Sequence, residues 1–243
     1  MKDAPLAAIW VYLATKPLLW LTATLVCYQL AVWIYRKAGE HPLLNPVAVA
    51  VALLIGLLIV TATPYPTYFS GAQFVHFLLG PATVSLAVPL YRQRAQLRTL
   101  ALPIAVALPV GILTAALSAM GLAWLLGASP QTLISLAPKS ATAPVALGIS
   151  EQLGGIPSLT AALVVTTGIV GAVFGTGLLR VLHIRDDAVK GVALGVSSHG
   201  IGTARAFQVS PVMGAFAGLA MALSAGLTAF LLPPLLHWLR LSS

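Results

Sequence analysis

The sequence predicts an all-α integral membrane protein with about seven to eight hydrophobic segments, in two inverted repeats with broken or re-entrant helices. Composition, the length of the apolar stretches and the positions of the charges all point to this fold class. Of the 243 residues, 59% are hydrophobic and only 7% are charged, whereas soluble domains carry about 25% charged residues. So much apolar surface favours lipid as the solvent over a soluble, large-cored enzyme.

The apolar stretches have the length of membrane-spanning helices, which need about 20 residues each. In chain order they cover 17–35, 43–62, 71–91, 99–127, 131–150, 157–180, 188–208 and 211–238. The single cysteine, Cys27, lies within the first stretch, so disulfide bonds play no part. The histidines show no metal-ligand spacing. We therefore expect one transmembrane domain over 1–243, with no metal and no other cofactor.

The net charge of +8 reflects clusters of cations at the segment ends. No basic stripe interleaved with aromatic residues is present, which argues against nucleic-acid binding. The pattern is that of the positive-inside rule, so we expect the clusters to face the cytoplasm. In order, the four clusters are Arg36 and Lys37; Arg92, Arg94 and Arg98; Arg180, Arg185 and Lys190; and Arg240.

If all four clusters lie on one side, an even number of crossings must separate successive clusters. Two segments separate the first cluster from the second, and two separate the third from the fourth, but three lie between the second and the third. One of these three must fail to cross. Segment 131–150 contains Pro138 and Pro144, each of which removes a backbone donor and disfavours helix before it. We predict that this segment is broken and re-entrant.

An internal similarity supports two halves, about 17–127 and 131–240. The stretches ALSAMGLAWLL (116–126) and ALSAGLTAFLL (222–232) agree at seven of eleven positions. Because Ala, Leu and Ser are common in membrane helices, chance similarity is an alternative. Combined with the crossing count, the similarity predicts halves of opposite orientation, an arrangement found in secondary transporters.

Helix breaks are expected at corresponding places in the two halves. The alternative is ordinary kinking and close packing, for which membrane helices also use glycine and proline. The predicted breaks are Gly80, Pro81, Pro138, Pro144 and Gly202, the last within SSHGIG (197–202).

Four ionisable residues lie in apolar surroundings: Lys139, Glu151, His199 and Arg205. A charge at the membrane centre costs about 2.5–3.5 kcal/mol on insertion scales. Glu151 and Arg205 lie near segment ends, so snorkelling to the interface is an alternative for both. A structural ion pair with Glu151 is an alternative for Lys139.

The polar groups beside the breaks suit an anion. We expect Thr142 to cap a helix with Pro144 in its first turn, which would point free N–H groups into the break. Donors outnumber acceptors, so a small hydroxy- or keto-carboxylate fits better than a cation. The predicted substrate-binding residues are Lys139, Ser140, Thr142, Ser197, Ser198, His199, Gly200, Thr203 and Arg205, with His199 and Glu151 as candidates for proton coupling.

Four stretches in the right order carry a specific resemblance. They are HPLLNP (41–46), GAQFVHFLLGPATVSLAVPLYRQR (71–94), PKSATAPVALGISEQLGGIPSLTA (138–161) and GVALGVSSHGIGTARAF (191–207). From about Pro17 to the C-terminus the chain resembles the LrgB/CidB family of membrane proteins. The family's usual Pro-Lys-Ser-Val-Thr-Thr-Pro appears here with Ala143 in place of the second threonine, which puts a ligand role of that hydroxyl in doubt.

The resemblance implies two functions. Bacterial members are described as holin-like or antiholin-like modulators of autolysis and murein hydrolase export, paired with a small LrgA/CidA-like membrane subunit. The plant relative is a plastid glycolate/glycerate translocator, and some bacterial members are linked to pyruvate movement. The resemblance also implies a multi-pass protein of the bacterial cytoplasmic membrane.

A donor-rich pocket favours a carrier over a pore. We therefore expect a secondary transporter of small monocarboxylates of the glycolate, glycerate or pyruvate class, working by alternating access with possible proton coupling. The alternative is the holin-like regulator. An enzyme is not expected, because no catalytic constellation is present. The expected partners are a small organic anion, the lipid bilayer, a separate small subunit and further copies of the chain, with no nucleic acid.

Overall fold

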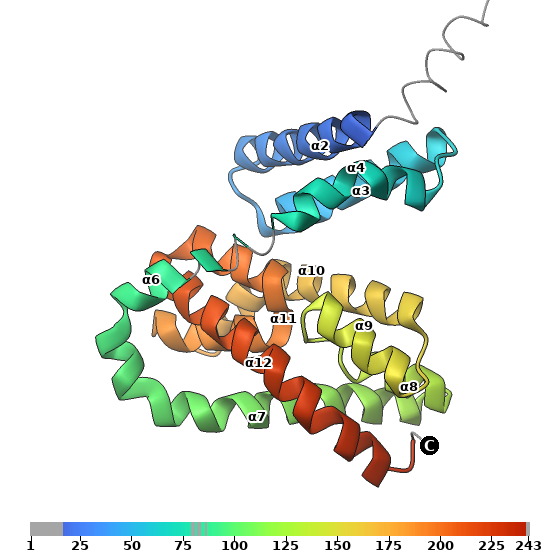
Figure 1. Cartoon of the computed structure of the whole chain (residues 1–243). Coiled ribbons are helices and arrows are strands. Elements are labelled where there is room, and N and C mark those ends of the chain that lie inside the picture. Colours follow the sequence, from blue (N-terminus) through green and yellow to red (C-terminus); the bar gives the residue numbers. More distant parts are fainter. Residues whose placement is uncertain (1–16, 79–80, 82–83, 86, 242–243) are drawn as a thin grey trace, which may run out of the picture. The chain divides into compact units, whose positions relative to one another are not determined.

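The computed structural model describes residues 17–78, 81, 84–85 and 87–241, and every regular element within them is a helix (Figure 1). The chain divides into two compact units, 1–85 and 86–243. Each unit has its own packing.

The first unit is a small group of helices in which α2 packs against both α3 and α4. Asn45 caps α3, because its Oδ1 accepts the N–H groups of Val47 and Ala48 at 3.0 and 3.3 Å. Trp20 is fully buried and meets the ring of Tyr68 edge-on, with the ring centres 6.0 Å apart. The elements are α2 (Pro17–Lys37), the 3₁₀ turn η1 (Pro42–Leu44), α3 (Pro46–Val60) and α4 (Tyr65–Phe77).

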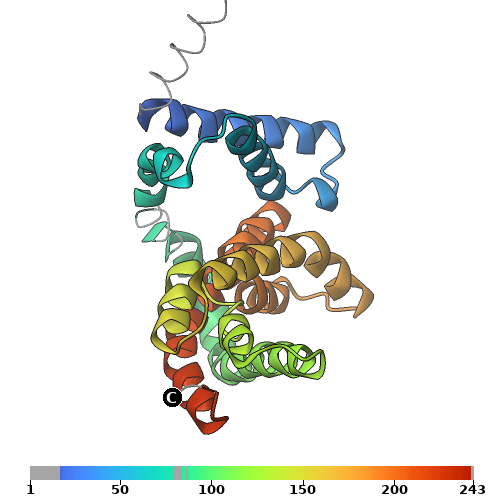
Figure 2. The same cartoon turned by 90° about the vertical axis from the view of Figure 1, so that its right-hand side faces the viewer.

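The second unit holds the candidate site. Its longest helix, α7, contains Pro103 and Pro109 and is bent in Figure 1, as proline in a helix interior commonly causes. Helix α10 packs against both α9 and α11 (Figures 1 and 2). The helices are α6 (Ala87–Arg92), α7 (Arg94–Leu125), α8 (Pro130–Leu136), α9 (Ala143–Gln152), α10 (Pro157–Val181), α11 (Asp187–Val209) and α12 (Pro211–Trp238).

Four helices among the described residues are long and apolar enough to cross a membrane: α2, α7, α10 and α12. They correspond to four of the predicted segments. Helix α3 has 15 residues, so it is about 22 Å long and short for a hydrocarbon core of about 30 Å. The predicted segment 71–91 is divided between α4 and α6, and residues 79–80, 82–83 and 86 lie outside the described residues. Segments 131–150 and 188–208 are broken within their length.

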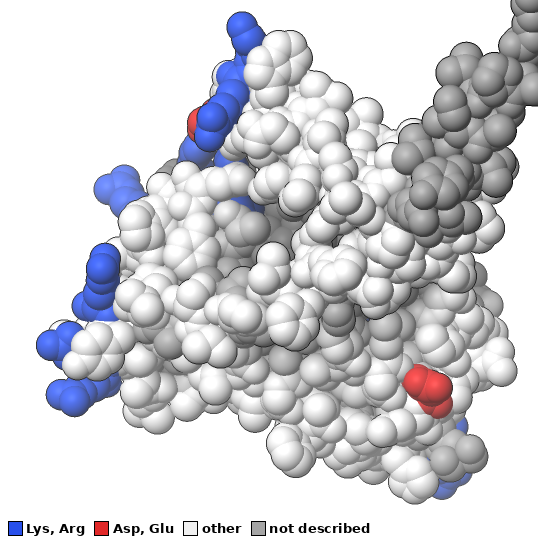
Figure 3. All heavy atoms as spheres, turned by 45° about the horizontal axis from the view of Figure 1, so that its top comes forward, with Lys and Arg blue, Asp and Glu red and all other residues white. Residues whose placement is uncertain are grey.

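The exposed surface is that of a membrane protein. Large apolar side chains are exposed on long helices and at their ends, among them Val60 (85% exposed), Phe230 (79%) and Leu126 (88%). Figure 3 shows wide uncharged areas, with lysine and arginine gathered in a few places. Such surfaces are costly in water and favourable in a bilayer.

Helix α11 lies against α10 on one side and α12 on the other at very close approach. A Cβ atom at Gly171 of α10 would overlap the side chain of Ser198, and one at Gly195 of α11 would overlap the carbonyl oxygen of Ala217 in α12. Small residues at helix contacts are the usual means of close packing in membranes. The three helices therefore form one tightly packed body.

Candidate functional site where two helical hairpins meet

Residues 130–152 form the first helical hairpin, with its turn at 137–142. Helices α8 and α9 have 7 and 10 residues, so they are only about 10 and 15 Å long. Ser135 and Ser150 lie seven residues before and eight after Thr142, and both contact Thr160 of α10. The Thr160 hydroxyl lies 2.7 Å from Ser150 Oγ and 3.1 Å from the Ser135 carbonyl oxygen. The predicted break in 131–150 is confirmed, and its two limbs return to a common base.

Helix α11 is a second helical hairpin. Its backbone breaks at His199, with φ 41° and ψ −134°. The Ser210 hydroxyl, just beyond the end of α11, donates to the Asp187 carboxylate at its start over 2.8 Å. A Cβ at Gly202 would lie 2.9 Å from the carbonyl oxygen of Leu194. The limb 200–209 therefore folds back along the limb 187–198.

This geometry corrects two expectations. Segment 188–208 does not cross from one end of the unit to the other, as the count of crossings assumed, but turns back on itself. The SSHGIG stretch does hold the break, but the break falls at His199, whereas Gly202 is helical and serves the close contact between the limbs.

The two hairpins have their bases at opposite ends of α10. The first base is tied to the start of α10 through Thr160, and the second lies beside its last turns, where Leu179 packs with Leu194 and Met213. Helix α12 runs from the second base back to the first, where Leu236 packs against Leu133.

The course of α10, α11 and α12 determines where the cationic clusters of this unit lie. Leu97 packs against the group that contains Ala188, so the cluster at the start of α7 lies at the end where Arg180 lies, as predicted. Arg240 follows α12 and lies at the other end. The prediction that Arg180 and Arg240 share one end is wrong, because α11 doubles back and only α12 runs the length between them.

The hairpin tips meet beside α10. A cavity of about 10 Å³, lined by Pro138, Ser140 and Ala141 of the first tip and Val196 of the second, has room for about one water molecule. Val164 of α10 packs with Ala141. The Val164 carbonyl oxygen also lies 2.9 Å from His199 Nε2. Ile112 of α7 and Thr228 of α12 complete the cavity wall.

Lys139 lies on the first tip, half-buried, and its Nζ donates to Ser140 Oγ at 3.3 Å. No ion pair joins Lys139 to Glu151. Glu151 is exposed near the end of α9, at the base of the hairpin. The structure therefore brings Lys139, but not Glu151, to the tips.

Thr142 occupies the N-cap position of α9, with Pro144 in the first turn, as predicted. Its hydroxyl makes no capping hydrogen bond, so that part of the prediction is wrong. The first N–H groups of α9 consequently lack a side-chain acceptor at the tip.

The second tip carries the predicted hydroxyls. Ser198 and Thr203 are buried, and the Thr203 hydroxyl donates to the His199 carbonyl oxygen at 2.8 Å. Ser197 is exposed, donates to the Ala193 carbonyl oxygen at 2.7 Å and lies 3.1 Å from Ser198 Oγ. Gly200 is exposed at the start of the returning limb.

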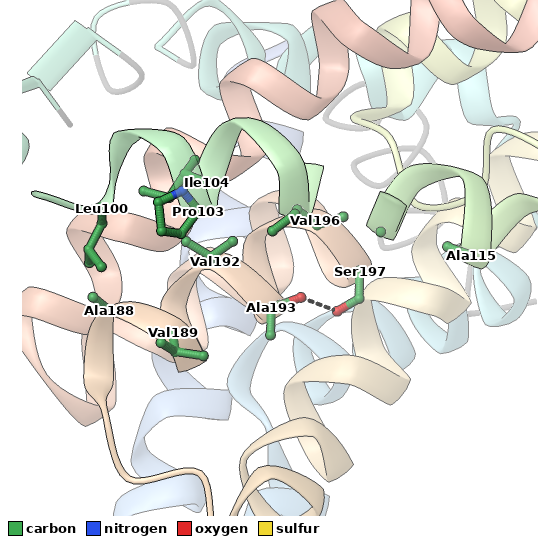
Figure 4. Close-up of a pocket in the computed structure, with 12 residues that line it drawn as sticks. Leu100, Pro103, Ile104, Ala115, Ala188, Val189, Val192, Ala193, Val196 and Ser197 are labelled. Atoms are coloured by element: carbon green, nitrogen blue, oxygen red, sulfur yellow. Dashed lines mark hydrogen bonds between the residues drawn. The ribbon is translucent and has the colours of Figure 1, made fainter. Parts of the chain in front are cut away.

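Ser197 also lines an apolar groove between α7 and the first limb of α11 (Figure 4). The groove has a volume of about 400 Å³ and extends from Leu100 and Ala188 to Ala115 and Val196. Ala115 and Val196 also line the small cavity, so the groove leads from the end near Leu100 to the hairpin tips.

Two predicted site elements lie elsewhere. Arg205 is on the returning limb of α11 and lines a cavity near the base of the second hairpin, with Arg180 and Lys190. Gly80 lies outside the described residues, and Pro81 belongs to the other unit. Among the residues that the structure describes, no cluster of three His, Cys, Asp or Glu side chains could hold a metal ion.

The tips offer donors for an anion. Each hairpin starts its second limb at the tip, so the first N–H groups of α9 and of limb 200–209 lie there, at the positive ends of helix dipoles. Such termini bind anions, and Lys139 adds an ammonium group on the same side. The first limbs end at the tips as well, and their carbonyl groups suit a cation or a donated proton.

Comparison with known proteins identifies the family of the chain. A model of the LrgB-like family matches residues 24–238. The chain is 36% identical over 195 residues to YwbG, an uncharacterised protein of Bacillus subtilis, covering 80% of this chain and 87% of that one. It is 34% identical over 216 residues to YxaC of the same organism, covering 89% and 93%. No solved structure matches the chain.

A further relative is the holin-like protein CidB of Staphylococcus epidermidis, which is 30% identical over 221 residues, covering 91% of this chain and 96% of that protein. The matched residues include both hairpins and the helices that hold them. This chain belongs to the LrgB family of membrane proteins.

Proposed function

We propose that this protein is a secondary carrier of small monocarboxylates of the glycolate, glycerate or pyruvate class, working by alternating access in the bacterial cytoplasmic membrane. The observation that carries the proposal is the meeting of two helical hairpins whose bases lie at opposite ends of α10. Broken helices of opposite orientation that meet near the membrane midplane are the arrangement in which transporters bind their substrates.

In this proposal each half of the site has a defined task. Lys139 and the N–H groups at the start of α9 hold the carboxylate, since a buried ammonium needs a counter-charge. Ser140, Thr142 and Ser198 contact the hydroxyl or keto oxygen of the substrate. Arg205 has no part in this site, because it lies near the hairpin base.

His199 is the residue that we propose for proton coupling. Its Nε2 carries the hydrogen donated to Val164, because a carbonyl oxygen only accepts. Nδ1 is then the nitrogen that takes up a proton, and uptake there converts a neutral ring into a cation beside the proposed carboxylate site.

We further propose that hairpins α8–α9 and α11, each followed by a long helix, are the working inverted repeat. Pro130–Val181 and Asp187–Trp238 each contain a hairpin and then one long helix. This division is shifted from the halves 17–127 and 131–240 expected from the sequence, and it places the site between the repeats. No catalytic role is part of the proposal.

A holin-like function is the second candidate, and the name of the related protein CidB supports it. In that case the chain assembles with copies of itself or with a small LrgA/CidA-like subunit to form a pore. Tight packing of Ser198 and His199 at the tips favours the carrier, because a pore needs an open lining and not a closed polar contact.

Uptake in proteoliposomes distinguishes the two functions. Labelled pyruvate, glycolate and glycerate are offered to vesicles with and without an inward proton gradient, and release of trapped dyes of two sizes is followed in parallel. A carrier gives saturable uptake that unlabelled substrate competes for, with both dyes retained. Release of the smaller dye without saturable uptake would support the pore, and absence of both uptake and release would refute the carrier.

A further inference from the structure

A second polar cavity lies at the base of the α11 hairpin, on the side away from the tips. It has a volume of about 560 Å³ and is lined by residues from α10, the loop after it, both limbs of α11 and the start of α12. Arg205 lies six residues beyond His199, a helical path of about 9 Å. The cavity is therefore separate from the proposed carboxylate site. Its polar lining residues are Thr176, Arg180, His183, Arg185, Lys190 and Arg205.

The lining carries four permanent cations, of which Lys190 is paired with Asp187. The whole chain has only five acidic residues, and two of these, Asp186 and Asp187, lie near the cavity. Both are already engaged. Asp186 caps α11 by accepting the N–H groups of Ala188 and Val189 at 2.7 and 3.1 Å. Asp187 pairs with Lys190 at 2.8 Å and accepts from Ser210.

Like charges around one cavity repel one another, and an anion between them relieves the repulsion. Arg180 and Arg185 supply planar guanidinium groups, which match the oxygens of phosphate in pairs. Arg180 and Arg185, with Arg205 beside them, present more donors than a single carboxylate requires. A phosphate group, with more charge and more acceptor oxygens, fits the lining better.

We infer that this cavity binds a phosphate-bearing anion, and that the bound anion ties the end of α10 to both limbs of the α11 hairpin. The phosphate is supplied either by the headgroup of an anionic phospholipid or by a soluble phosphate compound. In both cases it occupies the same cations, and it stabilises the base from which the second hairpin extends to the substrate site.

The test uses the full-length protein in an uncharged detergent at constant ionic strength. Its melting temperature is measured with inorganic pyrophosphate, with dioctanoyl phosphatidylglycerol and with dioctanoyl phosphatidylcholine as the zwitterionic control. A rise with pyrophosphate indicates a soluble ligand, and a rise with phosphatidylglycerol but not with phosphatidylcholine indicates a headgroup. No rise with either anion overturns the inference.

Matched variants locate the effect. Arg180→Gln with Arg185→Gln removes two charges from the cavity, whereas Arg94→Gln with Arg98→Gln removes two from the start of α7, outside it. We expect the first pair to weaken the apparent affinity at least tenfold and the second to leave it within about twofold. Equal losses in both pairs, or no loss in the first, contradict a specific cavity. If the double variant does not fold, Arg185→Gln alone, at an exposed loop position, must still weaken binding.

Discussion

His199 Nε2 lies 2.9 Å from the carbonyl oxygen of Val164, so the tip of the α11 hairpin is held to the backbone of α10 within the first half of that helix. The contact depends on Gly168, one turn further along α10. A Cβ there would lie 2.7 Å from His199 Cε1 and 2.9 Å from Nε2.

We therefore predict that Gly168→Ala displaces the imidazole and lowers carboxylate uptake by tenfold or more. Gly177→Ala on the same helix is the control, because no atom lies within 4 Å of a Cβ at that position. The control should keep full uptake and gain slightly in stability, since alanine is favoured over glycine in helices. Normal uptake by a folded Gly168→Ala protein would show that the His199–Val164 contact is dispensable.

Lys139→Met should abolish carboxylate uptake while the protein stays folded, because it keeps the apolar stem and removes a costly charge. Lys139→Arg retains charge but not the compact ammonium, so partial loss is expected. Uptake and melting temperature are measured together. Since no ion pair joins Lys139 to Glu151, Glu151→Gln should change neither quantity. A stable Lys139→Met protein that transports normally would remove this residue from the site.

The two hairpin bases should be accessible from opposite faces of the membrane. Single cysteines at Gln131 and Gln152 should react with an impermeant thiol reagent on one face, and those at Ala95 and Gln208 on the other, in a Cys27→Ala background. All four positions are exposed in the structure. Reaction of Gln131 and Gln152 from different faces would mean that 131–150 crosses the membrane.

Thr160→Val should loosen the base of the first hairpin. It leaves Ser150 Oγ and the Ser135 carbonyl oxygen, both in fully buried residues, without their contact to the Thr160 hydroxyl. Loss of buried hydrogen bonds costs about 1–3 kcal/mol, so thermal unfolding should begin several degrees lower. Thr166→Val, an exposed change on the same helix, should have no such effect. Equal stability of the two variants would show that apolar packing, and not the Thr160 hydroxyl, holds the base of the first hairpin together.

Acid should weaken the base of the second hairpin through Asp187. Hydrogen bonds from Lys190 and Ser210 hold the pKa of its carboxyl below the ordinary value. A lowered folded-state pKa stabilises the fold above the unfolded-state pKa, and this contribution is lost as the pH falls through the folded-state pKa. The side chain is 37% exposed, so the contribution is under about 1 kcal/mol. Melting curves between pH 6 and about pH 3 should converge for the unchanged protein and Asp187→Asn at the acid end. Parallel curves would exclude this linkage.

The sequence was sufficient for the helical membrane class and for both regions of broken helix. Composition sets the class, and Pro138 and Pro144 mark the first break because proline acts locally on the backbone. The N-cap of α11 at Asp186 is also predictable from the sequence, since it depends on residues within one turn.

The return of α11 was not predictable in the same way. A positive φ at His199 is sterically unfavourable for a residue with a Cβ, and it is stabilised here by a contact with Val164, 35 residues away. That contact uses a backbone carbonyl, which every residue has, so no side-chain pattern marks it. The error at Arg240 followed directly, because counting crossings treats each apolar segment as a span and a hairpin adds none.

The packing of α11 also decides which parts can move. Gly171 and Gly195 bring this hairpin into direct contact with α10 and α12 on its two sides, so sliding it alone would separate both close interfaces. The first hairpin is tied to α10 as well, through Thr160. Helix α7 also packs against this hairpin, since Ile104 and Ile112 lie in one buried cluster with Ala188 and Val196, and the 400 Å³ groove lies beside that contact. In the proposed carrier, any motion of the second hairpin would therefore have to take α10 and α12 with it.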